Sequence, residues 1–453
     1  MKKTDVLIVG GSAAGLVTAQ VGRSWHPEKS FLVVRDARSA LIPCAIPYLF
    51  GSLGTTEDDI LPDALATNGG AEVAVDRVTA IDRDAKRCLT ASGEPIAYDK
   101  LVLATGSKPK VPGWLRGADL RGVYTVPKEK EYLDRMLAEL AGASTVAVIG
   151  AGFIGVELAD QLRAQGKRVY LVEVLPHVLG MAFDEEIALE AESILTDSGV
   201  VLKCGLGVEE LVGDERVSSV RLANGERLDV DAVVLSMGYA PETNLAASCG
   251  LPLNDHGFIV VDEYMRTSDP DVLAVGDCAE KRDFITRRPS GVMLASTACA
   301  EARVAAMNLF ELCSIKPFSG TIAVYSTALG RTGFGTAGVT AAAASQAGIR
   351  IVTGSFTGVD RHPGALNSSH KQTVSLVAAR DSGTVIGGGV IGGLSAGEIT
   401  NVLGLVIQNR MSICDLLTSQ IGTHPCLTAS PAAYPLIKAA ESVAASMQPV
   451  TAL

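Results

Sequence analysis

The chain has 453 residues, which is too long for one ordinary hydrophobic core, so two to three domains are expected. Hydrophobic residues make up 47% and aromatic residues only 5%, which favours close helix–sheet packing over an aromatic-lined barrel. Fifty acidic against 39 basic residues give a net charge of −11, which excludes nucleic acid as a partner and disfavours an anionic membrane surface. No stretch approaches the length of an apolar transmembrane helix, so no membrane span is expected.

The nine cysteines are odd in number and scattered, and none forms a Cys-x-x-Cys pair or a zinc-like cluster. They predict a cytoplasmic, reduced protein without structural disulfides and without a metal site. The short apolar run from Val6 to Gly10 leads directly into a glycine turn, so it is interpreted as a first strand and not as a secretory signal.

Apolar runs alternate with helical patterns and short glycine breaks, which indicates a doubly wound α/β fold. The first 50 residues predict a strand, a glycine turn, a helix and the strand Phe31–Val34. Residues 145–173 repeat this unit, with a helix over Phe153–Gln165 and a strand over Val169–Val172. The repeat predicts two Rossmann-like dinucleotide-binding domains, one for FAD and one for NAD.

Further along the chain, a strand around Lys100–Gly106 is mirrored by the segment Ala232–Gly238, and Asp271–Asp277 predicts a return to the first domain. A long helix is expected over Ala295–Leu312. From about residue 320 the pattern changes to two helical patterns and short strands, over Ile349–Gly354, Gln372–Ala379 and Thr384–Val390, which predicts a third, α+β domain. We therefore expect an FAD-binding domain in two parts, 1–112 and 245–320, an NAD(P)H-binding domain at 113–244 and a C-terminal domain at 321–453.

The second glycine turn reads Gly150-Ala151-Gly152-Phe153-Ile154-Gly155. Its glycines suit a tight turn, a close approach of the backbone to a pyrophosphate and close helix–strand packing. The phosphates would lie at the helix N-terminus. Glu173 ends the next strand, where an acid binds a ribose 2′-hydroxyl and repels a 2′-phosphate, so NADH is favoured over NADPH.

The first turn, Gly10-Gly11-Ser12-Ala13-Ala14-Gly15, has a serine in place of its middle glycine, and its ribose-binding acid is missing or displaced to Asp36. Gly276-Asp277 follows an apolar strand, and such a pair can hold the ribityl chain of a flavin. Together with the duplication, these residues predict FAD at the first turn.

Cys44 lies in the segment Pro43-Cys44-Ala45-Ile46-Pro47-Tyr48, whose two prolines stiffen the chain around it. No second cysteine lies close enough in this segment to form a redox disulfide with it. Beside two cofactor sites, a thiolate-like Cys44 would attack disulfide, polysulfide or peroxide. The alternative interpretation is a buried, inert cysteine.

The chain resembles the flavoprotein disulfide reductase superfamily. The resemblance rests on both glycine turns, on Gly276-Asp277 and on motifs that include Cys44-x-x-Pro47-Tyr48, Ala104-Thr105-Gly106, Gly150-x-Gly152-x-x-Gly155-x-Glu157 and Gly238-x-x-Pro241. It covers nearly the whole chain. More narrowly, the chain is similar to the single-cysteine branch, which holds coenzyme A-disulfide reductases, NADH oxidases, NADH peroxidases and NAD(P)H:sulfur oxidoreductases.

The resemblance implies that Cys44 is the redox centre beside the flavin, with Pro43 and Tyr48 near the substrate. Ala13 replaces the histidine that oxidases and peroxidases carry in the first turn. Arg23 matches an arginine near a coenzyme A phosphate, although Ser24 replaces a second arginine, and Arg23 could equally be a solvated side chain. Phe153 matches an aromatic gate over the flavin, and Glu157 would contact the nicotinamide carboxamide.

The resemblance also implies a homodimer in which the C-terminal domain supplies a proton-transfer group to the partner. His424, in Thr423-His424-Pro425-Cys426, is the candidate general acid and base, although Ala429 replaces the glutamate that usually accompanies it. Tyr434 or His362 could substitute for it, and a structural histidine is the alternative interpretation. Cys426 is a second candidate thiol.

The predicted function is FAD-dependent, NADH-driven reduction of a small disulfide, polysulfide or persulfide, with coenzyme A as a candidate substrate group. Two alternatives remain open. One is an NADH oxidase that reduces oxygen, and the other is an NADH-oxidising subunit that passes electrons to an acceptor protein.

Overall fold

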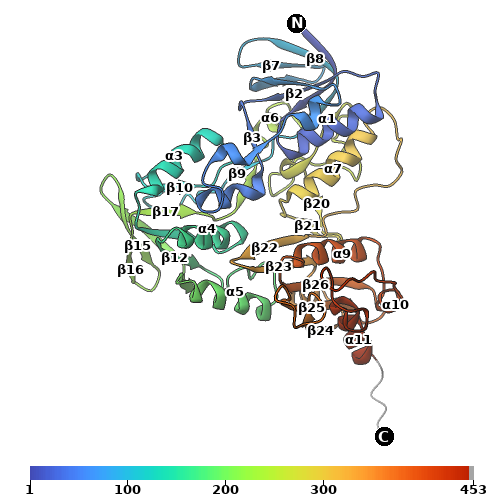
Figure 1. Cartoon of the computed structure of the whole chain (residues 1–453). Helices are drawn as coiled ribbons and strands as arrows, with labels where there is room; N and C mark the ends of the chain where they lie inside the picture. The colour runs from blue at the N-terminus through green and yellow to red at the C-terminus, as the bar shows by residue number, and fades with distance from the viewer. Residues whose placement is uncertain (448–453) are drawn as a thin grey trace.

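The first sheet of the computed structural model, which describes residues 1–447, has seven strands (Figure 1). Strands β5, β2, β1 and β8 are parallel neighbours, β19 pairs in parallel with β8, and β7 and β6 add antiparallel strands beyond β8. Helices α1 (Ala13–Trp25) and α7 (Ala295–Met307) pack against each other beside this sheet. The strands are β1 (Lys2–Val9), β2 (Phe31–Arg35), β5 (Glu72–Val75), β6 (Val78–Asp82), β7 (Arg87–Thr90), β8 (Pro95–Leu103) and β19 (Val272–Ala274).

The second sheet consists of five parallel strands in the order β10-β17-β11-β12-β13. Its central strands are fully buried apolar runs, as parallel sheets covered on both faces require. The strands are β10 (Val123–Thr125), β11 (Thr145–Ile149), β12 (Arg168–Glu173), β13 (Val201–Cys204) and β17 (Ala232–Leu235), with helices α3 (Lys130–Ala141), α4 (Phe153–Ala164) and α5 (Glu185–Asp197). A three-stranded antiparallel sheet, β14 (Val208–Gly213), β15 (Val217–Leu222) and β16 (Arg227–Asp229), projects from this part (Figure 1).

The two chain crossings between these sheets run side by side. Strand β9 (Ser107–Pro109) pairs in antiparallel fashion with β18 (Tyr239–Pro241), and the Lys110 N–H donates to the Gly238 carbonyl at 2.9 Å. This ribbon fixes the second sheet relative to the first.

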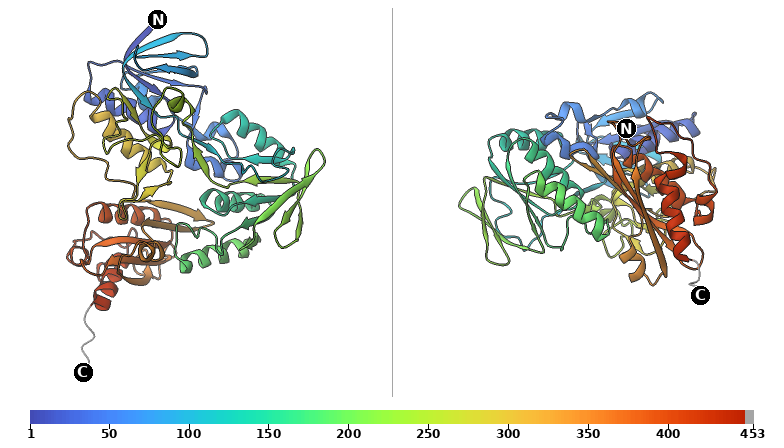
Figure 2. Two further views of the ribbon diagram at one scale, coloured as in Figure 1. Left: turned by 180° about the vertical axis from the view of Figure 1, so that it is seen from behind. Right: turned by 60° about the horizontal axis from the view of Figure 1, so that its bottom comes forward.

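The C-terminal part is a five-stranded antiparallel sheet in the order β22-β23-β26-β25-β24 with helices packed on it (Figure 2). Strand β22 also contacts α4 and α5, so this part closes against the second sheet. The elements are β22 (Tyr325–Leu329), β23 (Thr332–Gly338), α8 (Ala341–Gln346), β24 (Ile351–Val359), β25 (Lys371–Ala379), β26 (Val385–Gly392), α9 (Ala396–Gln408), α10 (Ile413–Leu417) and α11 (Pro435–Met447).

Short elements complete the described chain. The strands are β3 (Ala40–Leu41), β4 (Ile60–Leu61), β20 (Lys281–Arg282) and β21 (Pro289–Ser290). The helices are α2 (Ala64–Thr67) and α6 (Asn244–Ser248), and the 3₁₀ helices are η1 (Pro43–Phe50), η2 (Thr56–Asp59), η3 (Gly276–Cys278) and η4 (Pro431–Ala433).

The predicted fold class is confirmed: two Rossmann-like α/β parts are followed by an α+β part. The predicted helix Ala295–Leu312 is too long, because α7 ends at Met307. Asn308 terminates it, since its side-chain amide donates to the Val304 carbonyl and its side-chain oxygen accepts from the Ser314 N–H. Strands β22 and β23 were missed.

Candidate active site

Both glycine turns connect a buried parallel strand to a helix, and their outer glycines have no room for a side chain. A Cβ on Gly10 would lie 2.1 Å from the Ala104 carbonyl oxygen, and one on Gly15 would lie 1.9 Å from the Gly10 oxygen. The second turn repeats this geometry: a Cβ on Gly150 would lie 2.6 Å from the Ser236 carbonyl oxygen, and one on Gly155 would lie 1.8 Å from the Gly150 oxygen. The tight turns inferred from the sequence therefore exist at both places.

The middle position of each turn faces open space. A Cβ on Gly152 would meet nothing within 4 Å, and Ser12 occupies the same N-cap position of α1. Neither helix has a side-chain hydrogen bond at its cap. The first amides of α1 (Ala13, Ala14) and of α4 (Phe153, Ile154) thus lack a cap partner, and such amides bind phosphate. These residues fit the pyrophosphates of FAD and NAD(P)H.

Glu173 lies at the end of β12, beside the second turn. Its carboxylate accepts the Ala151 N–H at 2.7 Å and the Leu175 N–H at 2.8 Å, which fixes both oxygens in place. It lines a cavity of about 60 Å³ together with Gly152, Phe153 and His177. This placement suits the predicted contact with the ribose of NADH.

Asp36 does not take the corresponding place at the first turn. It is exposed and lies 3.4 Å from Arg77. Strand β2 ends instead in the buried Arg35, whose side chain covers Gly11 and whose guanidinium donates to Asp63 at 2.8 Å. Sequence reasoning missed this Arg35–Asp63 pair, and the contacts give no support to a ribose-binding role for Asp36.

Cys44 is the second residue of η1, after Pro43, and Pro47 lies inside the same 3₁₀ helix. Buried residues of η1, such as Leu49, share one core with the buried face of α4. Just beyond η1, the N–H and hydroxyl of Ser52 donate to the Gln161 side chain of α4 at 2.8 and 2.6 Å. The cysteine segment is therefore anchored on the helix that begins at the second glycine turn.

The surroundings of Cys44 come from four other segments. Burial raises the pKa of its thiol, Glu157 raises it further, Lys128 lowers it, and Asp277 and Cys299 add smaller increases. Although the residue is exposed at the chain surface, its thiol is crowded by protein on most sides, and the crowding is the largest cause. The protein groups alone therefore do not make Cys44 thiolate-like, and Glu157, Lys128, Asp277 and Cys299 are the ionisable groups near enough to affect the pKa of its thiol.

Asp277 is held by two side chains that the sequence did not point to. The Lys128 ammonium and the Ser107 hydroxyl both donate to its carboxylate at 2.7 Å. Burial is the largest single influence and raises the pKa of Asp277, but Lys128, Ser107 and Lys281 together outweigh it and leave the pKa below the ordinary value, so the carboxylate is ionised. Nearby, the Thr105 hydroxyl donates to the Glu242 carbonyl at 2.5 Å, and Gly106 and Gly238 adopt positive φ.

Strand β22 of the C-terminal part closes the site from another side. The Thr327 hydroxyl donates to the buried Glu157 carboxylate at 2.7 Å, and burial raises the pKa of Glu157 to about 7. Phe153 stacks on Tyr325 with ring centroids 4.7 Å apart. Burial raises the pKa of Tyr48 to about 12, and Thr327 lies within hydrogen-bonding reach of its phenol. No local sequence signal pointed to β22.

Arg23 lies in the last turn of α1 and is occupied by backbone acceptors. Its guanidinium donates to the carbonyls of Gly69 and Pro27, each at 2.9 Å, and to that of Lys29. These bonds hold the loop around Pro27 and Gly69. They give no support to the predicted contact with a coenzyme A phosphate.

The candidate proton-transfer residues lie in the C-terminal part. The His362 Nδ1–H donates to the Thr428 carbonyl at 2.9 Å, and the Nδ1 of the exposed His424 accepts the Cys426 N–H at 3.3 Å. These residues therefore belong to one loop cluster. Tyr434 is different, because it packs against the core of this part, and burial raises the pKa of its phenol.

The chain matches the family model described as pyridine nucleotide-disulphide oxidoreductase over residues 4–302, and the dimerisation domain of that family over residues 325–433. The chain belongs to this family. The resemblance stated from the sequence is thereby confirmed, and the protein is an NAD(P)H oxidoreductase whose family uses FAD.

Three relatives show how activities vary within the family. An NADH oxidase of Methanocaldococcus jannaschii is 30% identical over 435 residues, covering 92% of this chain and 94% of the relative. An NAD(P)H coenzyme A polysulfide/persulfide reductase of Pyrococcus horikoshii is 32% identical over 68% of this chain and 70% of its own. The structure of an NAD-dependent persulfide reductase from A. fulgidus superposes with a TM-score of 0.88 at 29% identity, covering 96% of this oxidoreductase and 82% of that chain.

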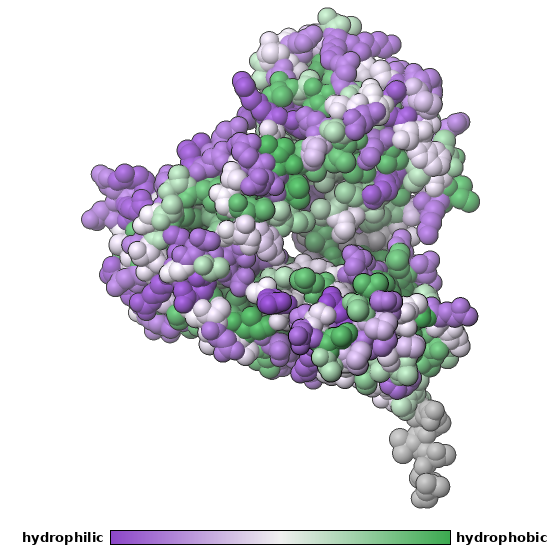
Figure 3. Space-filling model, in the orientation of Figure 1, coloured by the Kyte–Doolittle hydropathy of each residue, from purple (hydrophilic) through white to green (hydrophobic). Residues whose placement is uncertain are grey.

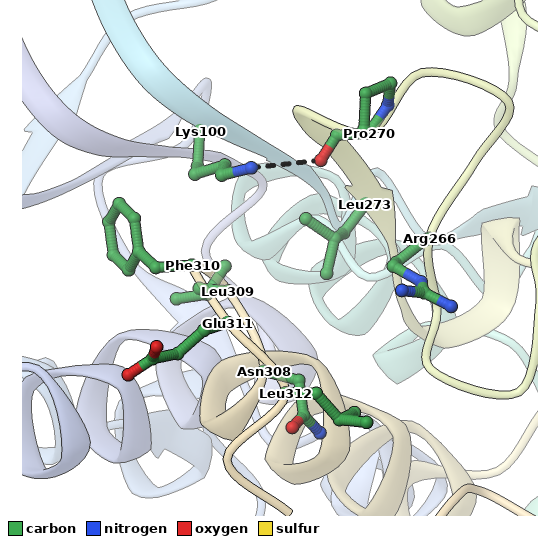
Figure 4. A pocket seen from close by; sticks show the side chains of 9 residues that line it. All are labelled: Lys100, Arg266, Pro270, Leu273, Asn308, Leu309, Phe310, Glu311 and Leu312. Carbon is green, nitrogen blue, oxygen red and sulfur yellow. Dashed lines mark hydrogen bonds between the residues drawn. The ribbon is translucent and has the colours of Figure 1, made fainter.

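A larger cavity of about 200 Å³ lies apart from these residues, where β8 and β19 meet the end of α7 (Figure 4). Both of its cationic side chains are paired, Lys100 with Asp271 at 2.7 Å and Arg266 with Asp262 at 2.6 Å. We do not include it in the site. Within residues 1–447 no helix is long and apolar enough to cross a membrane.

Proposed function

We propose that this oxidoreductase uses NADH to reduce a low-molecular-weight disulfide, polysulfide or persulfide through Cys44. The observation that carries the proposal is the position of Cys44. Cys44 lies on a proline-stiffened 3₁₀ helix that is anchored on α4, the helix that begins at the second dinucleotide-binding turn, and Glu157, Lys128 and Asp277 are charged groups that act on its thiol. Coenzyme A disulfide is a candidate substrate because a relative is named for coenzyme A.

In the proposed mechanism the residues of the second turn bind NADH, with Glu173 selecting its ribose. Residues Ser12 to Gly15, with Asp277, would hold FAD, which would supply a two-electron carrier between NADH and Cys44. Phe153 moves off Tyr325 to admit the nicotinamide, whose carboxamide Glu157 contacts. The two prolines of η1, Pro43 and Pro47, limit the movement of the Cys44 sulfur.

The sulfur chemistry is a thiol–disulfide exchange followed by reduction. The Cys44 thiolate attacks one sulfur of the substrate, so a Cys44–sulfur bond forms, the substrate sulfur–sulfur bond breaks and the first thiol leaves with a proton. Two electrons from NADH and a second proton then cleave the Cys44–sulfur bond. The second thiol is released and Cys44 returns to its thiolate form.

We further propose that the protein is a homodimer and that His424 or His362 of the partner subunit protonates the leaving thiol. The dimerisation domain of the family and the shared loop cluster of these two histidines support this proposal. Imidazole is suited to proton transfer near neutral pH.

An NADH oxidase activity is the second candidate, because the full-length relative from Methanocaldococcus jannaschii carries that name. Ala13 in the first turn favours sulfur over oxygen as the acceptor.

Steady-state NADH consumption tests the choice between these acceptors. Wild type, Cys44→Ser and the control Cys313→Ser, which changes another exposed cysteine, are compared with coenzyme A disulfide, polysulfide and oxygen. We expect sulfur-dependent turnover in wild type and Cys313→Ser, and its loss in Cys44→Ser with dye reduction intact. Turnover with oxygen alone would identify an oxidase, and a wild type that reduces dye but turns over neither sulfur compounds nor oxygen would favour electron transfer to a partner protein.

A further inference from the structure

A buried ion pair lies next to the Gly276-Asp277 turn, and it is part neither of the two glycine turns nor of the Cys44 segment. Lys281 of β20 and Glu301 of α7 have side chains exposed by 1% and 0%, with 3.7 Å between Nζ and Oε1. Two charges buried this deeply are costly unless they bind other polar groups. Their hydrogen bonds therefore indicate what the pair is for.

Both members of the pair bind the backbone of Gly276. The Gly276 N–H donates to Glu301 Oε2 at 2.8 Å, while Lys281 Nζ donates to the Gly276 carbonyl at 3.0 Å and to the Ala279 carbonyl at 2.9 Å. Gly276 has φ of +78°, a conformation that few other residues adopt readily. The pair thus holds the residue before Asp277 from both sides.

The same turn contacts the first glycine turn. A Cβ on Gly276 would lie 3.1 Å from the Cβ of Ala14 and 3.6 Å from that of Ala298. Ala14 belongs to the first turn of α1, and Ala298 lies one helical turn before Glu301 on α7. The Gly276-Asp277 turn therefore packs against the first turn of α1, and the pair links this turn to the middle of α7.

We propose that Lys281 and Glu301 are positioning residues for FAD. They hold the backbone of the Gly276-Asp277 turn in the conformation that places Asp277 for binding the cofactor. They do not touch the reacting atoms. The proposal rests on FAD binding, which the family implies, and not on the choice of sulfur substrate. It would stand if the acceptor proved to be oxygen.

The test removes the pair without leaving a lone buried charge. The double variant Lys281→Met/Glu301→Gln removes both charges. Its glutamine can still accept the Gly276 N–H, whereas the Gly276 carbonyl loses the ammonium group that donates to it. The full-length apoprotein is titrated with FAD, following flavin fluorescence, and its melting temperature and the visible circular dichroism of bound flavin are recorded. Lys203→Met, in the Lys203–Glu226 pair of the second sheet at 2.6 Å, is the matched control.

We expect the double variant to bind FAD about tenfold or more weakly, the effect of losing a buried hydrogen bond, and to change the circular dichroism of the bound flavin. The control should stay within about twofold of wild type. A double variant with a lowered melting temperature but unchanged FAD affinity and flavin spectrum would overturn the proposal, because the pair would then only stabilise the fold.

If the double variant does not fold, Glu301→Asp decides the question, since it keeps the charge and shortens the side chain by one methylene. Weaker FAD binding at an unchanged melting temperature supports positioning, and unchanged binding overturns it. A wild type that binds FAD but reduces no sulfur compound refutes the proposed substrate and leaves this inference intact.

Discussion

Cys44 carries the proposed chemistry in surroundings that by themselves oppose its ionisation. Burial and the Glu157 carboxylate both raise the pKa of the thiol, and Lys128 is the cation that lowers it. Lys128 is also bound to Asp277, so its charge is shared. The thiolate needed for attack on sulfur therefore depends on the cofactor that occupies the space between these residues.

Glu157 makes stability depend on pH in a defined direction. Burial raises its pKa to about 7, above the ordinary value of 4.5, so the folded chain binds this proton more tightly than the unfolded chain. Protonated Glu157 therefore stabilises the folded chain relative to ionised Glu157. This stabilisation is complete below about pH 4.5 and is lost as the pH rises through 7. Compared with Glu157→Gln, the wild-type apoprotein should lose up to about 3 kcal/mol of unfolding free energy between pH 4.5 and 8.

Denaturant unfolding at several pH values measures this difference, and Glu186→Gln on the exposed face of α5 is the control, because it should follow wild type at every pH. Parallel curves for wild type and Glu157→Gln would contradict the assignment.

Glu173 is expected to set the choice between the two nicotinamide coenzymes. Glu173→Ala removes the carboxylate that the Ala151 and Leu175 amides hold beside the second turn. We expect kcat/KM for NADH to fall about tenfold or more, and the preference for NADH over NADPH to shrink, because a charged acceptor and its repulsion of a 2′-phosphate are both lost. Steady-state kinetics with each coenzyme measure this, with Glu186→Ala as the control. An unchanged ratio would show that other residues select the coenzyme.

At the scale of elements, two glycines of the second turn have different roles: Gly155 is needed for folding and Gly152 for binding the coenzyme. A methyl group on Gly155 would collide with the Gly150 carbonyl, whereas one on Gly152 would enter open space. Gly155→Ala should therefore destabilise the chain by several kcal/mol, since backbone atoms must move. Gly152→Ala should melt close to the wild-type temperature and bind NADH more weakly, because the methyl group occupies the predicted pyrophosphate position. Thermal melts and NADH titrations of the two variants, compared directly, test this, and equal melting temperatures would contradict it.

Local patterns predicted the elements that depend on local sequence. The strands and helices around both glycine turns lie where periodicity places them, because each is a buried apolar run followed by a tight turn. Strand β23 was missed because it reads Thr-Gly-Phe-Gly-Thr-Ala-Gly, a composition that disfavours strands. Its glycines let α9 approach, since a Cβ on Gly335 would lie 1.7 Å from the Thr400 hydroxyl.

Only those site residues that belong to a sequence motif could be predicted. Cys44, Glu157 and Asp277 were predicted from sequence motifs, and Glu157 and Asp277 are among the groups that raise the pKa of the Cys44 thiol. Lys128, Cys299 and Thr327 were not found, because each reaches the site through long-range packing and has no distinctive neighbour in sequence. Asp36 and Arg23 were also predicted from spacing; Asp36 lies at the surface beside Arg77 and Arg23 donates to the Gly69 carbonyl, so their binding roles stay predictions.

At the scale of the whole molecule, the proposed proton transfer requires a second subunit. Three large apolar side chains of the C-terminal part are exposed. Leu394, just before α9, is 78% exposed, Leu405 on α9 is 58% exposed, and Leu427 in the loop that contains His424 is 69% exposed. A hollow separates this part from the first domain on the face shown in Figure 3. Exposed apolar groups on a dimerisation domain are expected to be covered by a partner.

Leu405→Glu should therefore convert the dimer to monomers, because it places a charge in the proposed interface. Sulfur-dependent turnover should fall with it, while reduction of a dye by NADH stays within about twofold of wild type, since both cofactor turns lie in one chain. Light scattering and the two assays measure this. Ile315→Glu, at an exposed position outside the dimerisation domain, is the control. A dimeric Leu405→Glu protein would exclude this face from the interface.

The most direct test of the central claim is an anaerobic titration with NADH of the FAD-loaded wild type and of Cys44→Ser, each first oxidised with polysulfide. If Cys44 is the redox centre, the wild type consumes NADH beyond the equivalent that FAD accepts, and Cys44→Ser stops at that equivalent. Identical titrations of the two proteins would show that Cys44 takes no electrons and would contradict the account.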